Sequence, residues 1–190
     1  LVNGDELLIH MRAKTDKPTH VNLTNHSYFN LNNGRGDIKK HELFIDAEEY
    51  TGLDENSIPT GKILKVEGSA YDFRQARAIG RDMDQLETGY DINYVLRGGA
   101  GEMKKAAAVY DTGSGRTLEV LTTLPGMQLY TANYVNHIPG KGGLYYEKHG
   151  SLCLETQFFP DSPNHMNFPS TLLKPGEIYD ETTIFRFGNE

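Results

Sequence analysis

Residues 106–123 read Ala-Ala-Ala-Val-Tyr-Asp-Thr-Gly-Ser-Gly-Arg-Thr-Leu-Glu-Val-Leu-Thr-Thr. Two runs of strand-forming residues, 106–110 and 117–123, flank a turn at 111–115 whose glycines readily adopt positive φ. This arrangement predicts an antiparallel β-hairpin. The same period-two alternation of apolar and polar residues continues in both directions from the hairpin, and long segments of helical period are scarce.

Further short strands are predicted on both sides of this hairpin. They are expected at residues 1–11, 21–28, 43–47, 90–96, 127–134, 151–158 and 182–187. Turn-rich residues separate them, and residues 74–86 are expected to supply one or two short helical turns. About nine short strands with frequent turns predict an all-β, antiparallel sandwich or barrel. No repeat or linker divides the chain, so residues 1–190 are expected to form a single domain.

Composition excludes several classes of partner. The 190 residues carry 19 basic and 26 acidic side chains, a formal charge of −7, and the isoelectric point is near 5.5. Neither nucleic acid nor an anionic membrane is an expected partner for such a chain. No apolar run approaches the roughly 20 residues of a membrane-spanning helix. The chain begins at Leu1 directly in a predicted strand, so an upstream segment is expected to be missing.

Cysteine usage and the N-terminus predict a cytoplasmic protein. Cys153 is the sole cysteine of the sequence and cannot form an internal disulfide. The N-terminus also lacks the succession of basic, apolar and small residues that marks a signal peptide. None of the seven histidines lies at a metal-ligand spacing from Cys, Asp or Glu along the sequence, so no metal site is predicted.

Four polar residues, His26, Asp91, Gln128 and Glu155, interrupt otherwise apolar strands. A carboxylate such as that of Glu155 is costly to bury between leucines unless it is partnered or functional. Each of the four by itself could belong to an internal hydrogen-bond network. Together, from different strands, they predict a polar concave sheet for a polyhydroxylated ligand, because a sugar needs amides and carboxylates for its hydroxyls and aromatic rings for its C–H faces.

Residues 22–31 read Asn-Leu-Thr-Asn-His-Ser-Tyr-Phe-Asn-Leu, and further segments of the same pattern follow at 54–61, 89–91, 118–133, 153–157 and 173–179. In this order, and over essentially the whole chain, the segments resemble the C-terminal part of the aldose 1-epimerase (galactose mutarotase) family. The resemblance implies an antiparallel β-sandwich of the galactose mutarotase type, incomplete at its N-terminus. It also implies a complementary N-terminal segment or chain as a partner.

The same resemblance implies an isomerase that interconverts the α and β anomers of free aldoses such as galactose and glucose. Glu155 matches the family's catalytic base at the C1 hydroxyl, and His26 matches the general acid at the ring oxygen. The substrate-binding positions are Asp91, Gln128, Asn25 and Tyr28. No metal or organic cofactor is implied. Ile92 stands where family members often carry histidine, so sugar contacts beside Asp91 are expected to differ.

Two other functions remain open at the level of sequence. One is a non-catalytic sugar-binding or regulatory module that keeps the mutarotase sheet. The other is a glycoside hydrolase that uses two carboxylates, here Asp91 and Glu155. A glycoside distinguishes the hydrolase from an epimerase, because its blocked C1 oxygen offers an epimerase base no proton to remove.

Overall fold

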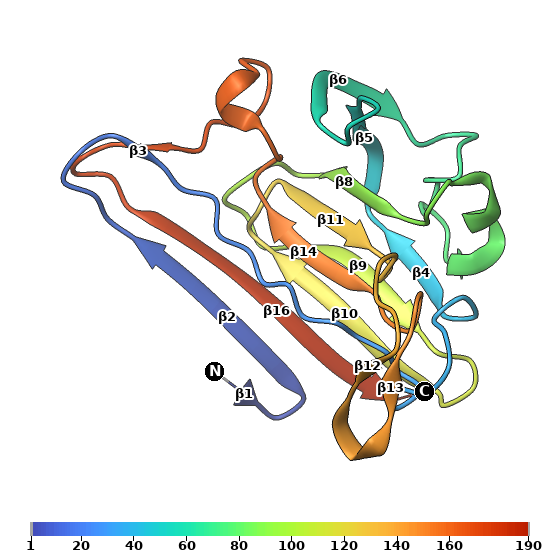
Figure 1. Ribbon diagram of the computed structural model, residues 1–190. Coiled ribbons are helices and arrows are strands. Elements are labelled where there is room, and N and C mark those ends of the chain that lie inside the picture. The colour runs from blue at the N-terminus through green and yellow to red at the C-terminus, as the bar shows by residue number, and fades with distance from the viewer. Residues whose placement is uncertain (1, 190) are drawn as a thin grey trace.

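The computed structural model describes residues 2–189, so the strand prediction for Leu1 lies outside the described residues. Two antiparallel sheets form the body of the structure (Figure 1). The larger sheet runs in the order β1 (Val2–Asn3), β2 (Glu6–Ala13), β16 (Tyr179–Asn189), β10 (Arg116–Thr122), β9 (Lys104–Tyr110), β4 (Glu42–Ile45) and β7 (Arg77–Ala78). The smaller runs in the order β14 (Cys153–Gln157), β11 (Gly126–Tyr130), β8 (Asp91–Leu96), β5 (Ala47–Leu53) and β6 (Pro59–Lys65).

Short elements connect these sheets. Within residues 2–189 they comprise two ribbons, β12 (Ile138–Pro139) with β13 (Tyr145–Tyr146) and β3 (Thr19–His20) with β15 (Leu172–Leu173), and four 3-10 turns, η1 (Ile79–Arg81), η2 (Met83–Gln85), η3 (Lys141–Gly143) and η4 (Ser162–Asn164). The turns η1 and η2 confirm the short helical turns predicted for residues 74–86. No helix among the described residues is long and apolar enough to cross a bilayer.

The core lies between the two sheets. Alternation along β10 turns Leu118 and Val120 inward, and alternation along β11 turns Met127 and Leu129 inward, all fully buried in one apolar cluster. Burying such a side chain in full contributes about 1.5–3 kcal/mol. The predicted antiparallel β-sandwich is therefore confirmed.

The hairpin predicted at residues 106–123 is also confirmed. The strands β9 and β10 pair antiparallel with Tyr110 opposite Thr117. Gly115 has a φ of +74° and donates its backbone N–H to the Asp111 carbonyl at 2.8 Å. The Asp111 carboxylate also accepts the Ser114 backbone N–H at 3.1 Å, so the turn residue satisfies the turn's own donors.

The strand predicted at residues 21–28 is wrong. Its chain is extended, but a backbone ladder to β14 is replaced by the Asn22 side chain, which donates to the Phe158 carbonyl at 3.0 Å and accepts the Phe158 N–H at 2.9 Å. Val21 donates its backbone N–H to the Thr171 carbonyl at 2.9 Å, and among the described residues backbone pairing with the segment that leads into β14 begins only at Phe29, opposite Leu152. A side chain that satisfies both backbone groups of Phe158 removes the partners that a strand would need.

The single strand predicted at residues 43–47 is two strands in two sheets. The larger sheet holds β4, which ends at Ile45, and the smaller sheet holds β5, which begins at Ala47. The crossing residue, Asp46, donates its backbone N–H to Ala106, which lies at an irregularity in the β9–β10 register. Period-two alternation is the same on both sides of this crossing, so the sequence pattern carries no sign of it. The strand predicted for residues 1–11 is likewise divided, by a turn in which Gly4 has a φ of +59°.

A chain of threonine hydroxyls joins the two sheets inside the core. Thr183 of β16 lies 3.1 Å from the hydroxyl of Thr122 in β10 and 2.6 Å from that of Thr156 in β14, and all three residues are buried. Its hydroxyl thus bridges the larger sheet to the strand that carries Glu155.

We expect Thr183→Val to lower the free energy of unfolding by about 1–3 kcal/mol, because the isosteric methyl leaves the Thr156 hydroxyl without its partner. Urea denaturation followed by circular dichroism measures this loss. Thr182→Val is the matched control, since its half-buried side chain, one residue earlier on β16, has no such hydroxyl contact among the described residues. Equal stability of wild type and Thr183→Val would contradict the role of the hydroxyl chain.

Candidate active site

The outer face of the smaller sheet carries the predicted site. Because the inward face of its strands holds Ile92, Leu129 and Leu154, their sequence neighbours point to the opposite face. Register then sets two rows across the strands. The first row joins Glu155, Gln128 and Asn93, and the second joins Cys153, Tyr130 and Asp91. Three of the predicted polar residues, Asp91, Gln128 and Glu155, are thereby brought onto one surface from three different strands.

Glu155 lies at the centre of β14, and its side chain is only 9% exposed. Burial is the main cause that raises the pKa of this carboxyl above its usual range. His26 acts in the opposite direction and lowers the pKa, whereas Asp91 raises it further. Glu155 is therefore a stronger base than an exposed glutamate.

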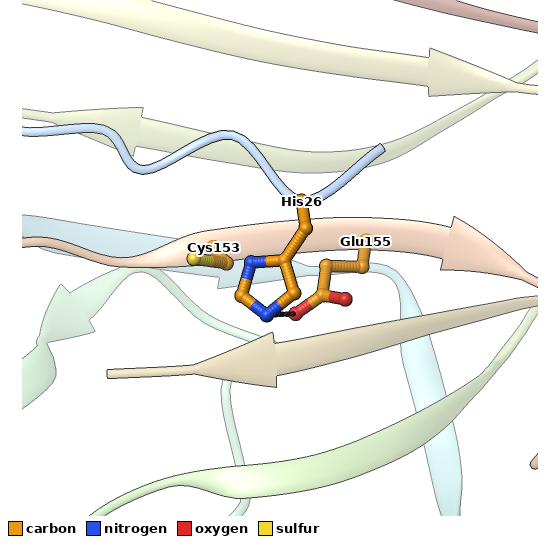
Figure 2. Close-up of side chains that lie close together, drawn as sticks. All are labelled: His26, Cys153 and Glu155. Atoms are coloured by element: carbon orange, nitrogen blue, oxygen red, sulfur yellow. Dashed lines mark ion pairs between the residues drawn. The ribbon is translucent and has the colours of Figure 1, made fainter. Parts of the chain in front are cut away.

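His26 meets Glu155 from the segment that runs beside β14. Its Nε2 lies 3.4 Å from Oε1 of Glu155, and its ring is half exposed (Figure 2). The local chain is shaped by Asn25, whose Oδ1 accepts the backbone N–H of Ser27 at 3.2 Å. Such a turn within the segment presents the side chain between them to the sheet.

Asp91 and Gln128 form a second polar pair on the same face. The amide of Gln128 donates to Oδ1 of Asp91 at 2.7 Å, and Asp91 is exposed at the start of β8. The Gln128 Oε1 atom is buried without a hydrogen-bond partner among residues 2–189. The pair thus offers an oriented carboxylate and an unused amide acceptor.

Two tyrosines surround the imidazole. Tyr28 is 52% exposed and stacks on the His26 ring with centroids 5.1 Å apart. Tyr130 meets the same ring edge-on at 5.9 Å. Aromatic faces of this kind suit the C–H surface of a sugar ring.

The structure brings five of the six predicted site residues to one face: Glu155, His26, Asp91, Gln128 and Tyr28. The sixth, Asn25, makes its hydrogen bond within its own segment. Sequence reasoning missed Asn93, Tyr130 and Cys153 as members of the same rows. Period-two spacing from Asp91, Gln128 and Glu155 could have indicated all three.

Ile92 has no place on the site face. Its side chain is 3% exposed and packs in the core between the sheets. Ile92 itself therefore does not face a sugar on this surface, because alternation along β8 turns consecutive residues to opposite faces, and a difference in the sugar contacts beside Asp91 stays a prediction.

The sequence model of the aldose 1-epimerase family matches residues 1–186. The chain belongs to the aldose 1-epimerase family. It is 46% identical to galactose mutarotase of Bos taurus over 189 residues, covering 98% of this chain and 55% of that protein. It is 38% identical to aldose 1-epimerase of Escherichia coli strain K12, covering 98% of this chain and 56% of that protein. The family resemblance of the sequence is thereby confirmed.

Solved structures of aldose epimerases share the fold. A GalM/aldose epimerase homologue from C. elegans superposes with a TM-score of 0.88 at 28% identity, over 97% of this chain and 56% of that chain. Galactose 1-epimerase from Lactobacillus acidophilus superposes with a TM-score of 0.81 at 26% identity, over 97% of this chain and 54% of that chain. This family member spans about half the length of the curated relatives it matches.

Burial of the Glu155 carboxylate is expected to lower the free energy of unfolding of the protein. A carboxyl whose pKa is raised by folding binds its proton more tightly in the folded state, so its contribution to stability is lost as the pH rises through that pKa. We expect Glu155→Gln to unfold with a free energy on the order of 1 kcal/mol higher than wild type at pH 8. The difference should disappear below about pH 4.3, where an unfolded glutamate is also protonated.

Urea denaturation at pH 8 and pH 4 measures this difference. The control is Glu55→Gln, since Glu55 is exposed in the turn between β5 and β6 and should leave stability unchanged at both pH values. A Glu155→Gln variant that is less stable than wild type at pH 8 would show that the carboxylate stabilises the fold instead.

Proposed function

We propose that this protein interconverts the α and β anomers of free aldoses such as galactose by acid/base opening and reclosure of the sugar ring. The observation that carries the proposal is the 3.4 Å approach of His26 Nε2 to Glu155 Oε1 above a polar sheet face. The C1 hydroxyl and the ring oxygen are bonded to the same carbon, so an acid and a base that serve them must lie side by side. The names of the curated relatives, galactose mutarotase and aldose 1-epimerase, support the same reaction.

The two side chains account for every proton in the reaction. The Glu155 carboxylate takes the proton of the C1 hydroxyl while His26 gives a proton to the ring oxygen. The bond between C1 and the ring oxygen breaks, and C1 becomes an aldehyde. After rotation about the C1–C2 bond, the C5 hydroxyl attacks the other face of the aldehyde and returns its proton to His26. Glu155 then returns its own proton to the C1 oxygen, and both groups regain their starting states.

The environment suits these transfers. A base works best when its pKa lies near the working pH, and burial moves the pKa of Glu155 upward in that direction. In this proposal the exposed Asp91 carboxylate and the Gln128 amide hold sugar hydroxyls, and their 2.7 Å hydrogen bond on the site face supports that role. Tyr28 and Tyr130 contact the C–H face of the sugar ring in this proposal, and their ring contacts with His26 support that role. Asn25 contributes by shaping the segment that presents His26.

Glu155→Gln should lower the rate of mutarotation of freshly dissolved α-D-galactose by more than about 100-fold, because the amide cannot accept the C1 proton. Polarimetry measures the rate after subtraction of the buffer reaction. The matched control is Glu181→Gln on β16, a half-buried carboxyl whose pKa is also raised by burial, and this variant should keep the wild-type rate.

Incubation with methyl α-D-galactoside distinguishes an epimerase from a glycoside hydrolase. Its C1 oxygen carries no proton, so we expect the protein to leave it unchanged. Hydrolysis of the glycoside, or full mutarotation by Glu155→Gln, would refute the assignment of Glu155 as the base that opens a free aldose.

The pH dependence of the enzymatic rate should follow the Glu155 carboxylate. Protonation removes the base, so the rate should fall as the pH decreases through a pKa above the usual value of about 4.3 for glutamate. Polarimetry from pH 4 to pH 8, corrected at each pH for acid catalysis by the buffer, measures this fall in the enzymatic rate. An enzymatic rate that stays constant down to pH 4 would contradict a role for a carboxylate with a raised pKa.

A further inference from the structure

Cys153 takes no part in the proposed proton transfers, although it lies on the site face of β14 two residues from Glu155. Its side chain is fully buried beside Tyr130 in the adjacent strand. Burial, together with the negative charges of Glu155 and Asp91, raises the pKa of the thiol far above its usual range. Cys153 is therefore a neutral thiol in the free protein and a poor nucleophile.

The thiol lies close to both groups of the acid/base pair. One imidazole nitrogen of His26, the sulfur of Cys153 and a carboxylate oxygen of Glu155 all lie within 4.8 Å of one another. In Figure 2 the imidazole is seen between the cysteine and the glutamate. The three residues, called the His–Cys–Glu trio below, come from two segments that are more than 120 positions apart in the sequence.

These distances approach those of a zinc centre. In a tetrahedral site with bonds of about 2.0–2.3 Å, neighbouring ligand atoms are about 3.3–3.8 Å apart. Nε2 of His26 and Oε1 of Glu155 are already 3.4 Å apart, and no separation within the trio needs to close by more than about 1 Å. His26 is half exposed and lies outside the strands, so its ring can make this adjustment without moving the sheet.

We propose that the His–Cys–Glu trio binds Zn²⁺ and that the bound ion inhibits the enzyme. Imidazole nitrogen, thiolate sulfur and carboxylate oxygen are each zinc ligands, and three of them leave a fourth tetrahedral position for water. The half-exposed imidazole leaves that position, and the entry path, on the open side of the sheet. Mg²⁺ and Ca²⁺ prefer sites made of oxygen ligands and should not compete.

Inhibition follows from the lone pairs that the ion occupies. Zinc on Glu155 and His26 removes both the base and the acid of the proposed reaction, so the inhibitory part of this inference rests on the proposed function. The Cys153 proton leaves to solvent when the thiolate binds the metal. Sugar and Zn²⁺ then compete for the same face, and galactose should weaken zinc inhibition.

Binding is tested first without sugar, with Co²⁺ as a spectroscopic probe of the whole chain. We expect one Co²⁺ per chain, with visible d–d bands of a tetrahedral ion and a near-ultraviolet thiolate-to-cobalt band, and Zn²⁺ should displace the ion and abolish both. Cys153→Ser should abolish the thiolate band and weaken Zn²⁺ binding by more than about tenfold. The matched control is His137→Asn, which breaks a second His–Glu pair, 2.7 Å from Glu147, and should leave the thiolate band unchanged.

Inhibition is then measured by polarimetry, with each variant compared with its own metal-free rate. Wild type should lose activity in micromolar Zn²⁺ and recover it with a chelator, whereas Cys153→Ser should need more than about ten times as much Zn²⁺. Absence of the thiolate band, or equal zinc affinity of wild type and Cys153→Ser, would overturn the metal site. A protein that shows the band but never accelerates mutarotation would instead keep the metal site and refute both the proposed function and the inhibition.

Discussion

The site depends on how the edge strand β14 is paired. On one side β14 forms a regular ladder with β11, and on the other side the segment 22–29 forms no backbone ladder with it before Phe29 within the described part of the chain. Asn22 holds one end through the backbone of Phe158, and Phe29 holds the other through Leu152. The middle of the segment has no ladder to satisfy. His26 can therefore lie over β14, with its ring in contact with Glu155. A regular strand pairing of the segment 22–29 would not by itself bring the two side chains together.

The same edge explains why a carboxylate is tolerated in an apolar strand. All five residues of β14 are buried, since one face packs into the core and the other is covered in part by the segment 22–29. An isolated charge there would be costly, but His26 provides an opposing group 3.4 Å from the Glu155 carboxylate. Beneath Glu155, the hydroxyl of Thr156 is held by Thr183 of the larger sheet. The core face of the strand that carries the proposed base is thus held by a hydrogen bond to the larger sheet, whereas its outer face carries a carboxylate that is costly to bury. Such a compromise between stability and function is common.

Much of the architecture is predictable from local patterns. The hairpin of β9 and β10 follows from two alternating runs and a glycine-containing turn, and β8, β14 and β16 follow from the same period, but β6 and most of β5 lie outside the predicted strands. The prediction fails at residues 43–47 and 21–28. A change of sheet at Asp46 leaves the alternation intact, and the pairing lost beside Asn22 depends on a backbone partner 136 positions away. Neither the change of sheet nor the lost pairing can be read from the local sequence, because each depends on which other segment supplies the backbone hydrogen bonds.

The sequence by itself determines the antiparallel β class, the family, and the identity of the polar residues that interrupt the apolar strands. Alternation along each strand also determines that Asp91 and Asn93 share a face, as do Cys153 and Glu155. Only the tertiary structure decides that these faces coincide, that the Gln128 amide turns to Asp91, and that the thiol of Cys153 lies within 4.8 Å of a ring nitrogen of His26. The physical reason is register. Side-chain direction is a property of one strand, whereas proximity across strands depends on hydrogen bonds between segments that are distant in the chain.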